Sequence, residues 1–142
     1  MITMEIQGLE QVKEEIRRIG KKAEDGVANA VKATALEVIT DVRRRIERGP
    51  KTGVTYTRGN ISHTASAPGE APATDKGFLA RSAYFEQSSK LSATVGSKMP
   101  KAYHLENGTT RIAPRPSWTP AVEAATPKLQ KRIEDAIRKA AQ

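Results

Sequence analysis

The feature that most constrains the fold is an apolar stripe at helical spacing in the first third of the chain. Its members step by three or four residues and are Val27, Val31, Ala35, Val38, Val42 and Ile46. Basic residues fall between them, so one face of the helix is apolar and the other is charged. Gly49-Pro50 ends the pattern, because proline cannot continue a helix and disfavours helix in the preceding residue. The segment 27–46 therefore predicts an amphipathic helix that must bury one face.

Weaker patterns precede this helix. Apolar and polar residues alternate over 2–7, which predicts a half-buried strand that ends at Gly8. Apolar residues then recur at helical spacing at Leu9, Val12, Ile16 and Ile19. Gly20 follows directly and predicts the end of this first helix.

The end of the chain predicts a last helix. Its apolar face comprises Val122, Ala125, Leu129, Ile133 and Ala136. Thr119 is expected to cap this helix, with Pro120 at the first helical position. Pro127 predicts a kink or a restart within it.

Between these helices the sequence predicts strands. Residues 78–87 and 91–97 read as two strands joined by a polar turn at 88–90, and 102–106 reads as a third, short strand. We therefore expect an α+β fold: a small antiparallel β-sheet with N-terminal and C-terminal helices packed on it. A length of 142 residues favours one domain over 1–142.

A long connection separates the helix 27–46 from the sheet. Residues 50–77 are rich in Gly, Pro, Ser and Thr, and 54–57 and 61–64 could pair as a hairpin. The stretch 67–72 cannot be helical, and its distinctive residues are Pro68, Gly69, Glu70 and Pro72. A loop of this length is unusual inside a compact domain. We expect an extended loop or hairpin arm over 50–77 that becomes ordered only against another chain.

The charge distribution points to the middle of the chain. The formal net charge is +8, and residues 51–118 hold nine basic against four acidic residues, whereas 1–50 hold ten against nine. Such an excess can serve nucleic acid, an acidic membrane surface or an acidic protein partner, or solubility alone. Composition leaves these alternatives open.

The residues of a catalytic site are not found. The chain has no Cys, and its two histidines, His63 and His104, are not in a metal-binding spacing. No phosphate-binding loop, dinucleotide fingerprint or nucleophile elbow occurs. We therefore expect no catalytic residue, no cofactor and no metal, and a protein that is not an enzyme. No apolar stretch approaches the length of a membrane span and no secretion signal is seen, so no membrane partner is expected.

The segment 103–120 carries the most distinctive residues. They are Tyr103, Glu106, Gly108, Thr109, Arg115, Pro116, Trp118 and Pro120. Asn107-Gly108 predicts a turn with a positive φ at the glycine. A bidentate pair between Glu106 and Arg115 would fix the path from the strand to the last helix. Trp118, the single Trp, is expected to anchor a core or an interface.

An ordered set of motifs resembles a known family. The set comprises two N-terminal helices, Gly49-Pro50 with Thr52-Gly53, the stretch 66–72, the stretch 77–82, Glu106 with Gly108-Thr109, and Pro120-Ala121. In this order they resemble the neck and tail-completion family of long-tailed bacteriophages, over roughly the second helix to the last. The chain departs from the family pattern at His104, where a small residue is usual, and in a one-position shift of the aromatic to Trp118.

This resemblance implies a structural virion protein. Similar proteins form rings, commonly sixfold, in the neck between the head connector and the tail tube, and double-stranded DNA passes through the bore without being read. The implied partners are further copies of the chain, a head connector or stopper, and tail-tube or terminator proteins. The implied location is the virion, after assembly in the host cytoplasm. Two alternatives remain: a tail terminator, and a basic nucleic-acid-binding module.

Overall fold

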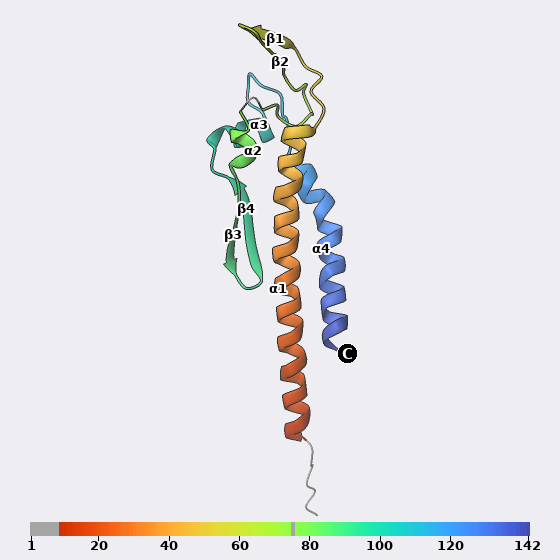
Figure 1. The fold of residues 1–142 in the computed structure, drawn as a ribbon. Helices are drawn as coiled ribbons and strands as arrows, with labels where there is room; N and C mark the ends of the chain where they lie inside the picture. The colour runs from red at the N-terminus through yellow and green to blue at the C-terminus, as the bar shows by residue number, and fades with distance from the viewer. Residues whose placement is uncertain (1–8, 75) are drawn as a thin grey trace, which may run out of the picture.

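The computed structural model describes residues 9–74 and 76–142 and has an α+β fold (Figure 1). In chain order the elements are α1 (Leu9–Arg48), β1 (Thr55–Arg58), β2 (Ile61–Thr64), α2 (Phe78–Arg81), β3 (Ala83–Ser89), β4 (Ser92–Ser97), α3 (Pro100–Asn107) and α4 (Trp118–Ala140). The predicted fold class is confirmed. The strand expected at 2–7 lies outside the described residues.

The long first helix is continuous, and the predicted end at Gly20 is wrong. Helix α1 runs for 40 residues from Leu9 to Arg48. A glycine inside a helix costs only about 1 kcal/mol relative to alanine, and Gly20 has no atoms of other elements within 4 Å of the position of a Cβ. The strongly amphipathic half that follows holds the helix together across this weak point. The expected end at Gly49-Pro50 is confirmed.

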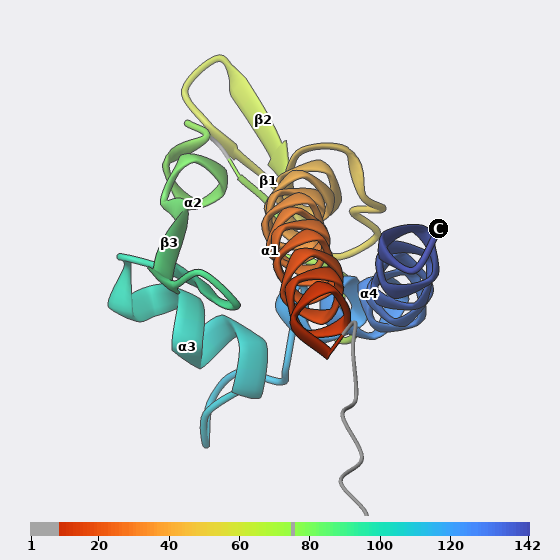
Figure 2. The ribbon, with the colours of Figure 1, turned by 90° about the horizontal axis from the view of Figure 1, so that it is seen from below.

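Helix α4 lies beside α1 over much of its length (Figures 1 and 2). Alanines dominate its buried face, and Gly26 of α1 allows a close approach, since a Cβ there would lie 2.9 Å from the Cβ of Ala136. The helix passes through Pro127 without a restart. It begins at Trp118, with Ser117 as the N-cap residue, so the predicted cap at Thr119 is placed two residues too late.

The strands form two separate two-stranded antiparallel sheets rather than one sheet. Strands β1 and β2 pair as predicted, with Tyr56 opposite His63. Strands β3 and β4 pair with Phe85 opposite Val95, and α1 packs against this second hairpin.

Two predicted strand segments are helical instead. Residues 78–81 form the short helix α2, which follows Gly77 at a φ of 72°, a backbone conformation that glycine supplies readily. The strand expected at 102–106 lies within α3, which begins on Pro100 at its first turn, where proline is favoured. The alternation of Tyr103 and Leu105 was too short to distinguish strand from helix.

The core is small and rests on alanine. Among the described residues, the largest fully buried side chains are those of Val42 and Ile46, which are 0% and 2% exposed. The central cluster consists of Val38, Val42, Ile46, Ala80, Ala121 and Ala125, with Leu79, Val95 and Trp118 packed against it. Large apolar side chains that stay more than half exposed are Val12, Ile16, Val54, Ile61, Phe78, Tyr103 and Ile137.

Candidate functional site: the junction between α3 and α4

The Glu106 carboxylate caps the last helix. It accepts hydrogen bonds from three successive backbone N–H groups: Ser117 at 2.7 Å, Trp118 at 3.0 Å and Thr119 at 2.7 Å. The first N–H groups of a helix have no partners within it, and a negative charge there also interacts favourably with the helix dipole. Glu106 from α3 therefore supplies the cap that the Ser117 side chain does not.

The predicted pair between Glu106 and Arg115 is wrong. The carboxylate is occupied by the start of α4, and the Arg115 side chain instead donates from Nε to the carbonyl oxygen of Ser66 at 3.3 Å. Partial burial of Glu106 opposes ionisation, but the hydrogen bonds from Ser117, Thr119 and Trp118 outweigh it and lower the pKa of this carboxyl. Glu106 is thus held as a charged group.

Gly108 and Thr109 form the turn that leads away from α3. Gly108 has a φ of 76°, as predicted, and a Cβ there would lie 2.9 Å from the carbonyl oxygen of Ile112. The Thr109 N–H donates to that same oxygen at 2.8 Å, and its hydroxyl accepts the N–H groups of Arg111 and Ile112. Both residues are needed for the shape of the turn.

Glu70 organises the base of the arm. Its carboxylate accepts the backbone N–H groups of Thr52 and Ala67, each at 2.9 Å, and a hydrogen bond from the Thr52 hydroxyl. These hydrogen bonds lower the pKa of the Glu70 carboxyl, and the bond from the Thr52 hydroxyl has the largest effect. The predicted arm therefore has two parts: a base held by contacts within the same chain, and the β1–β2 hairpin above it.

The base of the arm and the α3–α4 junction are joined to each other. The Gly69 N–H donates to the carbonyl oxygen of Pro114 at 3.0 Å, and Arg115 reaches Ser66, a residue only 4% exposed. Pro72 is buried and Pro116 is half-buried, whereas Pro68 is exposed. The base of the arm is thus in contact with other parts of the same chain, and the expectation that the arm orders only against another chain stays a prediction.

The aromatic residues of the junction border a surface groove. This groove has a volume of about 560 Å³ and lies between β4, α3 and the start of α4. Trp118 contributes to it and also packs against the core cluster, while Tyr103 is 69% exposed and makes an edge contact with His104. Pro120 is half-buried. Tyr103 is therefore available to a neighbouring molecule, and Trp118 acts chiefly as a core anchor.

A second hollow lies at the β1–β2 hairpin, and sequence reasoning did not single it out. Two adjoining hollows of about 450 and 310 Å³ share Tyr56, His63, Thr74 and Lys76. Arg58 lines the first and Lys101 the second. We call this the hairpin hollow. The basic excess of 51–118 was the signal that could have found it.

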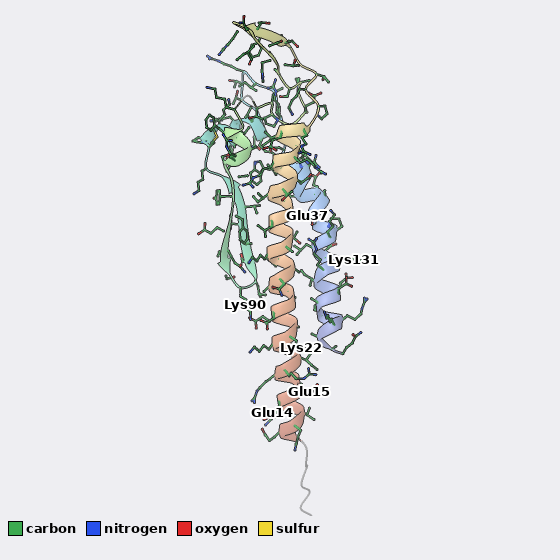
Figure 3. All side chains as sticks on the ribbon, viewed as in Figure 1. Glu14, Glu15, Lys22, Glu37, Lys90 and Lys131 are labelled. Carbon is green, nitrogen blue, oxygen red and sulfur yellow. The ribbon has the colours of Figure 1, made fainter. Side chains whose placement is uncertain are left out.

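Other polar contacts bind the helices and strands together. Arg43 of α1 donates to the carbonyl oxygens of Ala80 and Ala83, which fixes α2 and β3 on the helix. Glu37 of α1 pairs with Lys128 and with Arg132 of α4, and Lys90 at the β3–β4 turn reaches Asp25 at 2.7 Å. Glu37 and Lys90 are labelled in Figure 3. These contacts tie α1 to α2, to the β3–β4 hairpin and to α4.

Residues 9–74 and 76–142 contain neither a cluster of metal ligands nor a membrane-spanning helix. These residues contain no group of three or more His, Asp or Glu that could hold a metal ion. No helix among them has an apolar stretch long enough to cross a membrane.

Comparison of the chain with models of protein families, with curated proteins and with solved structures found no match.

Proposed function

We propose that this chain is a structural subunit of a tailed-bacteriophage neck, where it forms a ring that joins or completes the tail at the head–tail interface. The order of motifs from Gly49-Pro50 to Pro120-Ala121 resembles that family, and this resemblance supplies the assignment to the neck. The tail-terminator role is the neighbouring alternative, since its architecture is similar.

The imbalance between core and surface is the observation that carries the assembly part of the proposal. The largest fully buried side chains are Val42 and Ile46, while Val54 and Ile61 are 76% and 73% exposed. Aromatic residues are favoured at protein interfaces, and Phe78 and Tyr103 are 61% and 69% exposed. A subunit of this kind is stabilised when neighbouring copies cover such side chains. In a cyclic ring these contacts are heterologous, between different surfaces of adjacent subunits.

The α3–α4 junction supports a scaffold role rather than chemistry. The carboxylates of Glu70 and Glu106 both accept hydrogen bonds from backbone N–H groups. The Nε–H of Arg115 donates to a backbone carbonyl oxygen. These charged residues fix the arm and the junction in position. The protein therefore acts by presenting surfaces to a head connector or stopper on one side and to tail proteins on the other.

Cryo-electron microscopy of purified virions tests this proposal. We expect density for several copies of the chain in a closed ring between the connector and the tail tube, with the sixfold symmetry that the resemblance implies. The β1–β2 hairpin should contact a neighbouring molecule there. A single copy, or no copy, in the intact neck would overturn the proposal.

A further inference from the structure

We propose that the hairpin hollow binds the backbone phosphates of double-stranded DNA. This inference rests on the proposed function for the presence of DNA in the bore of the ring, and it names the surface that meets it. The hairpin projects beyond the end of α1, on the far end of the molecule from the start of that helix (Figure 1). A projection of this kind can reach into the centre of a ring.

Three cations from separate segments line the hollow. Arg58 lies at the end of β1, Lys76 precedes α2, and Lys101 lies in the first turn of α3. All three side chains belong to exposed residues, and none forms an ion pair with a carboxylate among 9–74 and 76–142. No described carboxylate lines the hollow, while Asp75 falls outside the described residues. The described lining of the hollow thus contains cations and no carboxylate.

The remaining polar groups suit phosphate oxygens. Ser62 and Thr74 contribute hydroxyl groups and Tyr56 a phenol. Contacts to the DNA backbone come from Arg and Lys together with Ser, Thr and Tyr side chains. The Arg58 guanidinium lies 5.8 Å from the centre of the Tyr56 ring, which in turn contacts His63 at 5.2 Å between ring centres. These contacts hold the cation at the rim of the hollow in a defined position.

The composition favours DNA over an acidic protein face. Lysine is depleted in protein–protein interfaces, whereas two of the three cations of the hollow are lysines, and exposed Lys98 lies close in sequence. Lysine is a flexible point charge that neutralises phosphate without demanding a fixed geometry. Binding of this kind carries no sequence information, which suits DNA that slides through a bore.

Salt-dependent DNA binding by the full chain tests the inference. The probe is a short mixed-sequence DNA duplex carrying a fluorophore, titrated at about 50 to 200 mM salt. The hollow variant is R58A/K76A/K101A. The matched control is K21A/K22A/K131A, which removes the same charge from exposed lysines of α1 and α4 away from the hairpin; Lys22 and Lys131 are labelled in Figure 3.

We expect wild type and control to bind with similar affinity and salt dependence. The slope of log K against log salt changes by roughly 0.9 for each phosphate that is neutralised, so the hollow variant should lose about two to three units of slope. Its affinity at about 100 mM salt should fall by at least about tenfold. Thermal unfolding confirms that both variants are folded, which is expected because all six side chains belong to exposed residues.

Three results would overturn the inference. One is wild-type protein that does not bind the duplex at low salt, and another is an equal loss in both variants. The third is stronger binding to a polyglutamate peptide than to DNA at the same salt, which would assign the hollow to an acidic protein. None of these bears on head–tail joining, which is read separately by electron microscopy of particles.

Discussion

The carboxylate of Glu106 accepts a 2.7 Å hydrogen bond from the backbone N–H of Ser117, eleven residues further along the chain. Together with the bonds from Trp118 and Thr119, this contact ties the end of α3 to the start of α4. A side chain from outside the last helix thereby fixes the point at which that helix begins.

We predict that Glu106→Ala destabilises the protein by about 2 kcal/mol, because hydrogen bonds to charged groups and helix caps contribute in this range. Glu123→Ala is the matched control, since Glu123 is an exposed glutamate of α4. Its effect should stay within about 0.5 kcal/mol. Denaturant unfolding measures both variants. Equal losses would mean that the cap does not stabilise the fold.

The same cap predicts a pH dependence. The pKa of Glu106 is lowered in the folded protein, so its contribution is fully present above the unfolded pKa of about 4.3 and is lost as the pH falls through the folded value. A carboxyl of this kind contributes a slope of up to about 1.4 kcal/mol per pH unit. In Glu106→Gln this side chain no longer titrates, so the decline in unfolding free energy below about pH 5 should be shallower than in wild type. Parallel curves for the two proteins would contradict the assignment.

Two glycines of α1 should respond in opposite directions to the same substitution. Gly20→Ala should stabilise the protein by about 1 kcal/mol, because alanine is the better helix former and the position is open. Gly26→Ala should destabilise it by about 1 kcal/mol net, since a Cβ would lie 2.9 Å from that of Ala136 and overpacking outweighs the helix gain. Thermal unfolding of both variants decides. A stabilised Gly26→Ala would mean that α4 is not packed this closely on α1.

The β1–β2 hairpin should be the first site of tryptic cleavage in the free subunit. Arg58 is exposed beside the turn at Gly59, and exposed turns are preferred sites of proteolysis. The Lys51 ammonium, in contrast, donates to the carbonyl oxygens of Arg45 and Ala71. Mass spectrometry of early fragments should therefore find cleavage after Arg58 before cleavage after Lys51, and assembled particles should resist both. Equal rates at the two sites would show that the base of the arm is as open as the hairpin.

Much of the fold followed from periodic patterns that are long enough to be distinctive. The helix predicted from the stripe between Val27 and Ile46 and its end at Gly49-Pro50 are in place. The hairpin predicted for 54–57 and 61–64 is also formed, with its first strand shifted by one residue to 55–58. The predictions around Phe78 and Tyr103 were wrong, because a segment of four or five residues fits the period of a strand as well as that of a helix. The helix end predicted at Gly20 was wrong, because the free-energy cost of a glycine inside a helix is small beside the packing of the rest of α1.

The residues of the candidate site could be selected from the sequence, but most of their hydrogen-bond partners could not. Glu106 and Arg115 were selected from the sequence, and the sequence also indicated opposite charges that could pair. The fold instead brings unpartnered N–H groups of α4 to Glu106 and the carbonyl oxygen of Ser66 to Arg115. Backbone partners of this kind do not appear in a sequence, because every residue carries them. The hairpin hollow is lined by three segments that are separated in sequence, and composition alone does not predict that they lie together.

Electron microscopy of a lysate of the phage that lacks this chain tests the central proposal most directly. We predict DNA-filled heads and finished tails that are not stably joined, and restoration of joined particles when wild-type protein is supplied. Normal joined virions in the deletion lysate would contradict a role in the neck.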